Sequence, residues 1–149
     1  MKTVKGDLIK LAKEGAFDVI IHGCNCFNTM GHGIAAQVKR ELHEAYVVDQ
    51  HTQRGYSSKL GTYSVAKIII EGRVLWVVNA YTQYEYGGNK VNANYRAIQQ
   101  VFRKIKKDFS GKRIGIPKIG CGLAKGNWQT VSEIIETELN GEDITLVVL

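Results

Sequence analysis

The chain has 149 residues and a net charge of +6, with 44% hydrophobic and 23% charged residues. This balance is that of an ordinary globular protein and excludes a disordered chain, and no apolar run approaches the roughly 20 residues of a membrane-spanning helix. Because the N-terminal segment also lacks the apolar core of a signal peptide, we expect a single cytoplasmic domain over residues 1–149.

The first part of the chain is predicted to run strand, helix, strand, helix. A short strand at Thr3–Val4 precedes a short helix with Asp7 as its N-cap, because a carboxylate accepts the free amides of a first helical turn. The continuous apolar run Phe17–Ile21 is typical of a strand covered on both faces. Apolar residues at spacings of three and four then indicate a second helix. These residues are Ile34, Ala35, Val38, Leu42 and Tyr46.

A polar segment and a hairpin come next. We interpret Val48–Leu60 as an ordered excursion or a lid. The runs Gly61–Ile70 and Arg73–Ala80 are rich in β-branched and aromatic residues, which are typical of strands. They are separated only by Glu71-Gly72, so a tight hairpin of antiparallel strands is predicted.

The last part of the chain is predicted to alternate helices and strands. After the polar loop Tyr81–Asn92, a helix has one apolar face and one basic face, and we interpret the basic face as solvated. Its apolar residues are Ala97, Ile98, Val101, Phe102 and Ile105. Arg113–Ile116 is the next strand, Asn127 caps another helix, and Ile144–Leu149 is a closing strand. This alternation predicts a three-layer α/β/α domain with a central mixed sheet.

Two glycine-rich segments, His22–Gly33 and Pro117–Gly126, each connect a predicted strand to a predicted helix. Ligands of open α/β sheets bind beyond the carboxyl ends of the strands, where helix N-termini direct amide groups toward anions. We therefore expect the two segments to form a cradle for a nucleotide-like phosphate ligand. The charge of +6 suits attraction of a small polyanion and leaves nucleic acid as an alternative.

Three other kinds of site fit these segments less well. Gly31–Ala36 matches the dinucleotide fingerprint formally, but it lies too far from the preceding strand and lacks the acidic residue expected about 20 residues further on. Cys24 and Cys26 lack the paired spacing of zinc sites, so no metal or cofactor is expected. Cys121 precedes a helix N-terminus, which can lower a thiol pKa, but no histidine lies near it in sequence.

Five motifs resemble, in this order, those of macrodomains: GDL, HGCNCFNTMGHGIA, SKLGTYS, QYEYGGNK and IPKIGCGLAKGNW. The resemblance extends over essentially the whole chain. The chain is similar to the single-domain branch that includes ADP-ribose 1''-phosphate phosphatases and the terminal ADP-ribose protein glycohydrolase. The resemblance implies the family's three-layer fold and a site for ADP-ribose or a derivative.

The resemblance also implies which residues contact this ligand. Asp7, followed by Leu8, would accept the adenine amino group, and Tyr84 would flank the ligand. The first glycine-rich loop would surround the distal ribose and part of the diphosphate through Asn25, Asn28, Met30, Gly31, Gly33 and Ile34. The second would donate backbone amides to the diphosphate from Ile119, Gly120, Cys121, Gly122 and Leu123. Simpler interpretations stay open: Asp7 as an N-cap only, Asn28 as a turn residue, and Tyr84 as an ordinary surface or core residue.

One departure from the family pattern narrows the expected reaction. The glycohydrolase relatives carry an aspartate directly after GCGL and a lysine in the loop before the long basic helix. Here Ala124 holds the first position and Gly87 falls near the second, although Lys90 lies close by. Covalent sugar chemistry is therefore not expected, whereas hydrolysis of ADP-ribose 1''-phosphate is. His32 is the acid or base candidate because of the natural pKa of histidine, with Asn28 as the second catalytic candidate. A solvent-facing turn histidine is the simpler alternative.

Two other functions stay open. The chain is either a reader that binds ADP-ribose without turnover, or a hydrolase that removes ADP-ribose from modified protein or nucleic acid. In the second case the charge of +6 would recruit the macromolecule. We expect a monomer without membrane contact, whose partners are ADP-ribose, ADP-ribose 1''-phosphate or ADP-ribosylated macromolecules.

Overall fold

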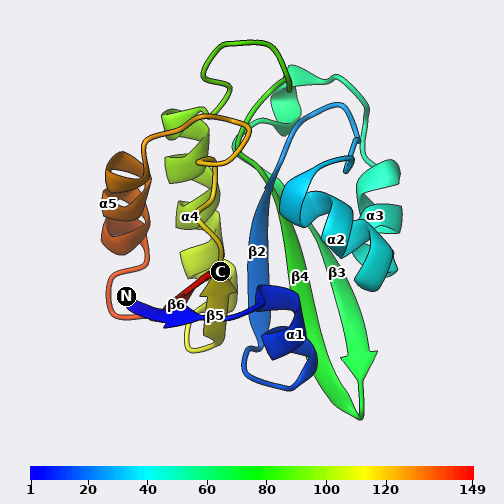
Figure 1. The fold of residues 1–149 in the computed structure, drawn as a ribbon, viewed down its shortest axis with the longest axis vertical. Coiled ribbons are helices and arrows are strands. Elements are labelled where there is room, and N and C mark those ends of the chain that lie inside the picture. The colour runs from blue at the N-terminus through cyan, green and yellow to red at the C-terminus, as the bar shows by residue number, and fades with distance from the viewer.

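One six-stranded sheet forms the centre of the computed structural model, which describes residues Met1–Leu149 (Figure 1). Its strands are β1 (Lys2–Lys5), β2 (Val19–Cys24), β3 (Tyr63–Ile70), β4 (Arg73–Tyr81), β5 (Arg113–Ile116) and β6 (Asp143–Val148). The α-helices are α1 (Leu8–Lys13), α2 (Gly33–Glu41), α3 (His43–Gln50), α4 (Tyr95–Phe109) and α5 (Trp128–Glu138), and a short 3-10 helix, η1 (Ser57–Lys59), precedes β3. None of these helices combines the length and apolar character needed to cross a membrane.

The strands lie in the order β1-β6-β5-β2-β4-β3. Every neighbouring pair is parallel except β3 and β4, which form an antiparallel hairpin. The hairpin turns at Glu71 and Gly72, whose φ values of +49° and +76° suit a two-residue turn with both central residues in the left-handed region. The predicted hairpin and mixed sheet are therefore confirmed.

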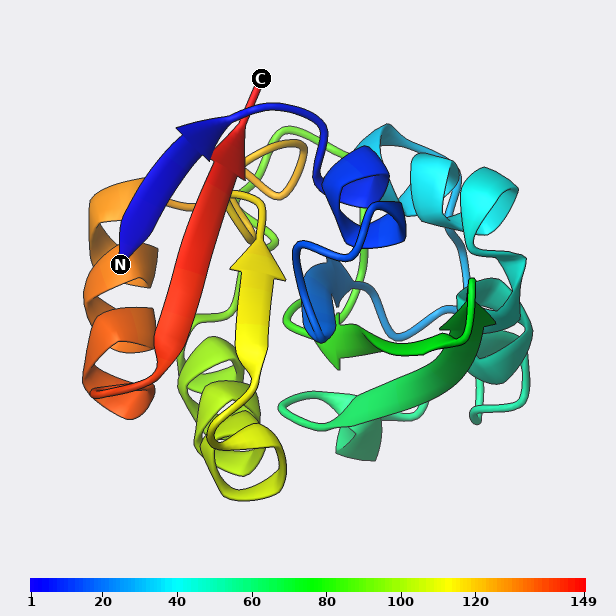
Figure 2. The same cartoon turned by 90° about the horizontal axis from the view of Figure 1, so that it is seen from below.

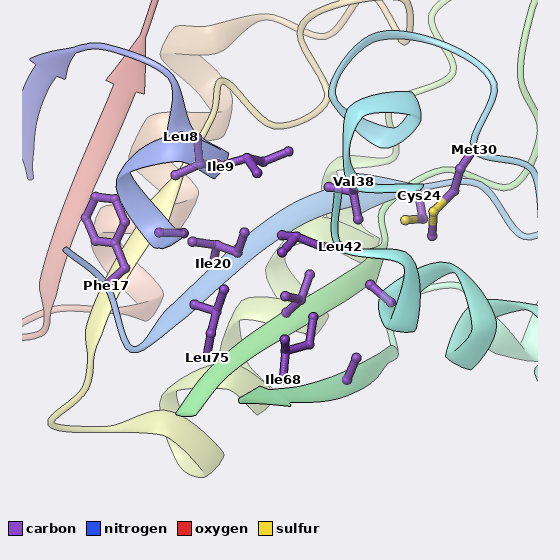
Figure 3. Packing of buried hydrophobic residues seen from close by; sticks show 14 of the residues in the cluster. Leu8, Ile9, Phe17, Ile20, Cys24, Met30, Val38, Leu42, Ile68 and Leu75 are labelled. Atoms are coloured by element: carbon purple, nitrogen blue, oxygen red, sulfur yellow. The ribbon is translucent and has the colours of Figure 1, made fainter. Parts of the chain in front are cut away.

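Helices cover both faces of the sheet (Figures 1 and 2). Helices α1, α2 and α3 pack on one face and α4 and α5 on the other, each side with its own cluster of buried apolar residues. Strand β2 serves both, because Ile20 belongs to the first cluster whereas Val19 and Ile21 belong to the second. Figure 3 shows the first cluster, to which α1 contributes Leu8 and α2 contributes Val38. The predicted three-layer α/β/α fold is confirmed.

Side-chain caps fix the starts of three helices. Asp7, Asn94 and Asn127 each accept a hydrogen bond from the backbone amide three residues further on, at 3.0, 2.9 and 3.1 Å. Each such cap is typically worth about 1 kcal/mol, since it satisfies an amide that the helix leaves free. The caps predicted at Asp7 and Asn127 are confirmed.

Part of the basic face of α4 forms ion pairs with neighbouring elements. Arg103 pairs with Glu138 of α5 at 3.0 Å, and Lys106 pairs with Glu142, just before β6, at 2.6 Å. This face is exposed, as predicted, but part of its charge ties α4 to its neighbours.

The helix predicted through Ile34 and Tyr46 is in fact two helices. The chain leaves the helical conformation at Leu42, with φ −130° and ψ 58°. The imidazole of His43 then donates to the carbonyl of Lys39 at 3.0 Å. Because the Leu42 side chain stays buried, the apolar stripe continues across the break, and for this reason the sequence pattern did not reveal it.

Strand β2 is also shifted relative to the prediction. It begins at Val19 rather than Phe17 and ends at Cys24 rather than Ile21, since its pairing with β4 continues as far as Tyr81. His22 therefore belongs to the strand and not to the loop.

Candidate functional site

The two glycine-rich loops leave the sheet side by side. Because β2 and β5 are parallel neighbours, the first loop (residues 25–32) and the second loop (residues 117–127) extend from the same edge, at the top of Figure 1. Gly23, just before the first loop, allows Thr82 to pack closely against β2, since a Cβ there would lie 2.7 Å from Oγ1 of Thr82. The sequence predicted this juxtaposition.

The first loop is anchored at both ends. Asn25 Oδ1 accepts the amide of Phe27 at 2.8 Å, and Asn25 Nδ2 donates to Oγ1 of Thr29 at 2.7 Å. Met30 buries its side chain in the same cluster as Cys24 (Figure 3). The backbone amides of residues 28–32 donate to no group of the chain.

Asn28 directs its side chain back into the chain. Its φ of +59° lies in the left-handed region, which asparagine tolerates better than most residues. Oδ1 accepts a hydrogen bond from Nζ of Lys59 at 2.5 Å, and Nδ2 donates to the carbonyl of Thr52 at 2.9 Å. Gln50 donates to the Asn28 carbonyl at 2.7 Å. Both ends of the Asn28 amide are thus bonded within the chain.

The second loop is a turn closed on itself. Gly120 has a φ of +73°, and its carbonyl accepts the amide of Gly126 at 2.7 Å. Ile119 is buried in the core, whereas Leu123 is 70% exposed. The amides of residues 122–124 donate to no group of the chain. The loop therefore presents backbone donors rather than polar side chains.

Cys121 does not have the character of a nucleophile. Its thiol donates to the carbonyl of Ile119 at 3.3 Å. Partial burial raises the pKa of Cys121, and the opposing influence of Lys118 is smaller. A reactive cysteine needs a lowered pKa, so the thiol is not activated here.

A third loop, residues 82–94 after β4, braces the other two. The amide of Asn92 donates to the carbonyl of Ala124 in the second loop at 2.9 Å. On the other side, the hydroxyl of Tyr84 donates to the carbonyl of Gly55 at 2.8 Å. The Tyr84 ring also meets Phe27 of the first loop edge-on, with ring centroids 5.0 Å apart. Tyr84 therefore lies beside the first loop.

Sequence comparison relates the whole chain to a phage protein, although no family model matches it. An uncharacterized 17.5 kDa protein from the tk-vs intergenic region of Enterobacteria phage T4 is 34% identical over 152 residues. These residues cover 99% of this chain and 95% of that protein. The chain belongs to the same family as this phage protein.

Structure comparison identifies the fold. The chain is similar to a macrodomain protein from Streptomyces coelicolor, with a TM-score of 0.71, 24% identity and coverage of 99% of this chain and 98% of that one. It is also similar to DarTG of Thermosipho africanus in complex with ADP-ribose, with a TM-score of 0.73, 18% identity and coverage of 100% of this chain and 42% of that one. The chain is a macrodomain by fold.

Asp7 has two structural contacts in this macrodomain. It caps α1, and its carboxylate accepts a hydrogen bond from Nε2 of Gln37 on α2 at 3.0 Å. The amide of Lys10 is the main cause of a lowered pKa of Asp7, so the carboxylate is charged at neutral pH. Leu8 beside it is buried in the first cluster. Asp7 thus lies next to the helix that continues from the first loop.

His32 lies at the exposed start of α2. It occupies the N-cap position without making a side-chain cap bond, and its imidazole has no hydrogen-bond partner in the chain. Gly31 and Gly33 on either side of it are exposed, and Ile34 is half-buried. The amides of residues 33–35 have no backbone partner, as expected for a first helical turn, and they form the positive end of the helix dipole.

The two positions that depart from the family pattern, Ala124 and Gly87, are both hydrogen-bonded to Asn92 of the third loop. Ala124 is buried, and its carbonyl accepts the amide of Asn92. The carbonyl of Gly87 accepts a hydrogen bond from Nδ2 of Asn92 at 2.9 Å, and Lys90 forms an ion pair with Glu85.

A buried polar cluster behind the first loop was not predicted. Asp49 and Lys59 are both buried, and the hydroxyl of Tyr81 donates to Oδ1 of Asp49 at 2.6 Å. One pattern in the sequence does indicate Asp49: it follows Ala45 by four and Leu42 by seven, so it shares the buried face of the helix. Lys59 has no comparable local pattern.

The cluster continues to His22 and Asn79 on the sheet. Nε2 of His22 donates to Oδ1 of Asn79 at 2.7 Å. Burial lowers the pKa of His22 to about 4, and it raises the pKa of Cys24, so both groups are neutral. His22 and Cys24 are therefore core residues of the macrodomain.

A cavity of about 290 Å³ lies at the opposite edge of the sheet from the three loops. Its two arginines are already bonded, because Arg113 pairs with Asp18 at 2.9 Å and Arg73 donates to the carbonyl of Glu14 at 3.0 Å. The unpartnered backbone donors of the macrodomain loops make the loop edge the better candidate site.

Proposed function

We propose that this macrodomain binds ADP-ribose between its first and second loops and hydrolyses ADP-ribose 1''-phosphate to ADP-ribose and inorganic phosphate. The similarity to a solved protein that holds ADP-ribose supports the choice of ligand. The motifs shared with ADP-ribose 1''-phosphate phosphatases, together with the departure at Ala124, support the choice of reaction.

Two glycines carry the binding proposal. Gly31 and Gly122 lie one in each loop, and a Cβ added to either would meet nothing within 4 Å and would need no positive φ. Every other glycine of the chain either has a positive φ or would place its Cβ against a neighbouring atom. The fold therefore gives no reason for glycine at these two positions, whereas close approach of a ligand to the backbone does.

The unpartnered amides give this site its chemistry. Residues 28–35 and residues 122–124 present two sets of backbone donors at one edge of the sheet. Donors of this kind at a helix N-terminus favour anions, and a diphosphate carries two neighbouring anionic groups.

The proposed contacts follow the loops. Asp7 and Leu8 take the adenine, and Tyr84 flanks the ligand. Leu8, Met30 and Ile119 have buried side chains, so they contribute through their backbone. The residues assigned to the ribose and diphosphate are Asn25, Asn28, Met30, Gly31, Gly33, Ile34, Ile119, Gly120, Cys121, Gly122 and Leu123.

In the proposed reaction, water adds to phosphorus and the bond from phosphorus to the 1''-oxygen breaks. That oxygen takes a proton and leaves as ADP-ribose, while the phosphate takes the oxygen of water. His32 serves as the acid or base, and the loop amides stabilise the charge on the phosphoryl oxygens. Asn28 contributes by holding the loop, because its amide is bonded to Lys59 and Thr52.

The test combines binding and turnover. Calorimetric titration with ADP-ribose is expected to show binding, and 31P NMR is expected to show phosphate released from ADP-ribose 1''-phosphate. In His32→Ala the rate is expected to fall by about 10²-fold or more with ADP-ribose affinity retained, because a general acid or base contributes on this scale. The exposed His51→Ala is the matched control and is expected to keep the wild-type rate.

Each failure has a distinct meaning. Lack of ADP-ribose binding contradicts the whole proposal. Binding without phosphate release contradicts the reaction and leaves a reader. Release of ADP-ribose from modified protein or nucleic acid, without action on the phosphate ester, identifies the third function.

A further inference from the structure

One buried cation lies directly beneath the first loop. Lys59 is only 7% exposed, although lysine is almost never buried without partners. Its ammonium donates to the carbonyl of Cys26 at 3.2 Å and to Oδ1 of Asn28 at 2.5 Å. Both acceptors belong to the first loop, so the hydrogen bonds of this lysine are directed at the loop.

The other groups around Lys59 leave its hydrogen bonds to the first loop. Asp49 faces it from α3, Cys24 from the end of β2, and Cys26 from the first loop. The Tyr81 ring faces it from β4, with Nζ 4.8 Å from the ring centroid. Burial lowers the pKa of Lys59, and the negative charge of Asp49 partly offsets this. No carboxylate oxygen lies within 4 Å of Nζ.

The same stretch of chain holds the loop at further points. The amide of Gly55 donates to the Cys26 carbonyl at 2.7 Å, so this oxygen has two donors. Thr52 and Gln50 bond the Asn28 side chain and carbonyl. The left-handed turn at Asn28 is thereby fixed from residues that come much later in the sequence.

We propose that Lys59 is a positioning residue for the ligand site. Its ammonium holds Cys26 and Asn28 so that the amides of residues 28–32 keep one arrangement before the ligand arrives. Lys59 acts through Asn28 and does not touch the ligand. The choice of ligand rests on the proposed function, whereas the effect on the loop does not.

The experiment separates holding the loop from balancing charge. Lys59→Met removes the donor and leaves Asp49 without its nearby cation, and the double variant Lys59→Met with Asp49→Asn removes both charges. Each is compared with the exposed Lys107→Met as matched control. Three quantities are measured: thermal stability, ADP-ribose affinity by calorimetry, and amide hydrogen exchange at Cys26, Phe27 and Gly55 in the free protein.

Lys59→Met is expected to speed exchange at these amides and to weaken ADP-ribose binding by about tenfold or more, since a hydrogen bond from a charged donor is lost. The double variant is expected to regain stability but not affinity or slow exchange, because Cys26 and Asn28 still lack their donor. Lys59→Arg, which keeps a cation, is expected to recover part of both. Lys107→Met is expected to match the wild type.

Two results overturn the proposal. One is affinity and exchange in the double variant within about twofold of the wild type, which would mean that Lys59 only balances charge. The other is unchanged exchange in Lys59→Met. If Lys59→Met does not fold, the double variant decides. If the wild type does not bind ADP-ribose, the proposed function fails, while the exchange measurement still tests whether Lys59 positions the loop.

Discussion

Single residues of the site hold the fold and, in our proposal, the ligand as well. Asn25 closes a turn through Phe27 and Thr29, and Asn28 joins the first loop to Thr52 and Lys59. The motifs indicated which residues belong to the loops. They did not indicate the partners of Asn28, because these lie 24 and 31 residues away and no local pattern reports such a contact.

Substitution of Gly31 and Gly122, the two glycines that the fold does not require, tests the site residue by residue. Gly31→Val and Gly122→Val are expected to change the free energy of unfolding by no more than about 0.5 kcal/mol, since neither Cβ is strained or crowded. ADP-ribose affinity is expected to fall at least tenfold, because the side chain occupies the space of the ligand. Calorimetry and urea unfolding measure the two effects.

Gly72→Val provides the opposite control. Gly72 lies in the distant hairpin turn with a φ of +76°, so valine there is expected to cost stability while leaving ADP-ribose affinity unchanged. Normal affinity in both loop variants would show that the ligand does not approach Gly31 or Gly122.

Among the elements, those with strong periodicity were predicted well. The apolar face of α4 and the hairpin turn follow from local sequence alone. The break at Leu42 does not, because the buried stripe runs through it. Val48–Leu60 proves to be an ordered excursion whose first residues complete α3, and the amide of Gly55 bonds it to Cys26.

The link between α3 and the sheet predicts how stability depends on pH. Asn79 accepts from His22 and donates to the carbonyl of Ala45 at 2.9 Å. Burial lowers the pKa of His22 from 6.5 to about 4, so between these values the unfolded chain binds a proton that the folded chain excludes. The neutral, buried His22 therefore contributes fully to the free energy of unfolding above about pH 6.5. This contribution, up to about 3 kcal/mol, is lost as the pH falls toward 4.

His22→Gln is expected to lower stability at pH 7 and to remove this part of the pH dependence. The measurement is the free energy of urea unfolding at several values between pH 4 and 7. The exposed His51→Gln is expected to keep the wild-type slope. An equally steep slope in His22→Gln would show that another group causes it.

In the whole molecule, the two apolar clusters share one sheet. Alternate residues of β2 pack into opposite clusters, so loss of either layer of helices would expose one apolar face of a strand whose other face the remaining layer still covers. Composition and the order of predicted elements sufficed to predict this architecture, because each strand and helix carries the apolar pattern of its layer. The order of strands in the sheet was not predicted, since it depends on pairings distant in sequence.

The shared sheet leads us to expect a single cooperative unfolding transition. Trp76 and Trp128 both pack against the second cluster, so tryptophan fluorescence reports on that layer, while far-UV circular dichroism reports on all helices. The two signals are expected to give the same urea midpoint. Separate midpoints would show that the layers unfold independently.

The strand order also affects how the protein is made on the ribosome. The only neighbour of β1 in the sheet is β6, so the first strand to be synthesised cannot pair until the last one has been synthesised. Strand β2 likewise pairs only with strands that come later in the chain, β4 on one side and β5 on the other. The hairpin of β3 and β4 is the one pair joined by a tight turn, which makes it the earliest sheet structure available to the nascent chain. The two loops meet only after β5 has been synthesised, so a truncated nascent chain without β5 has no ligand site.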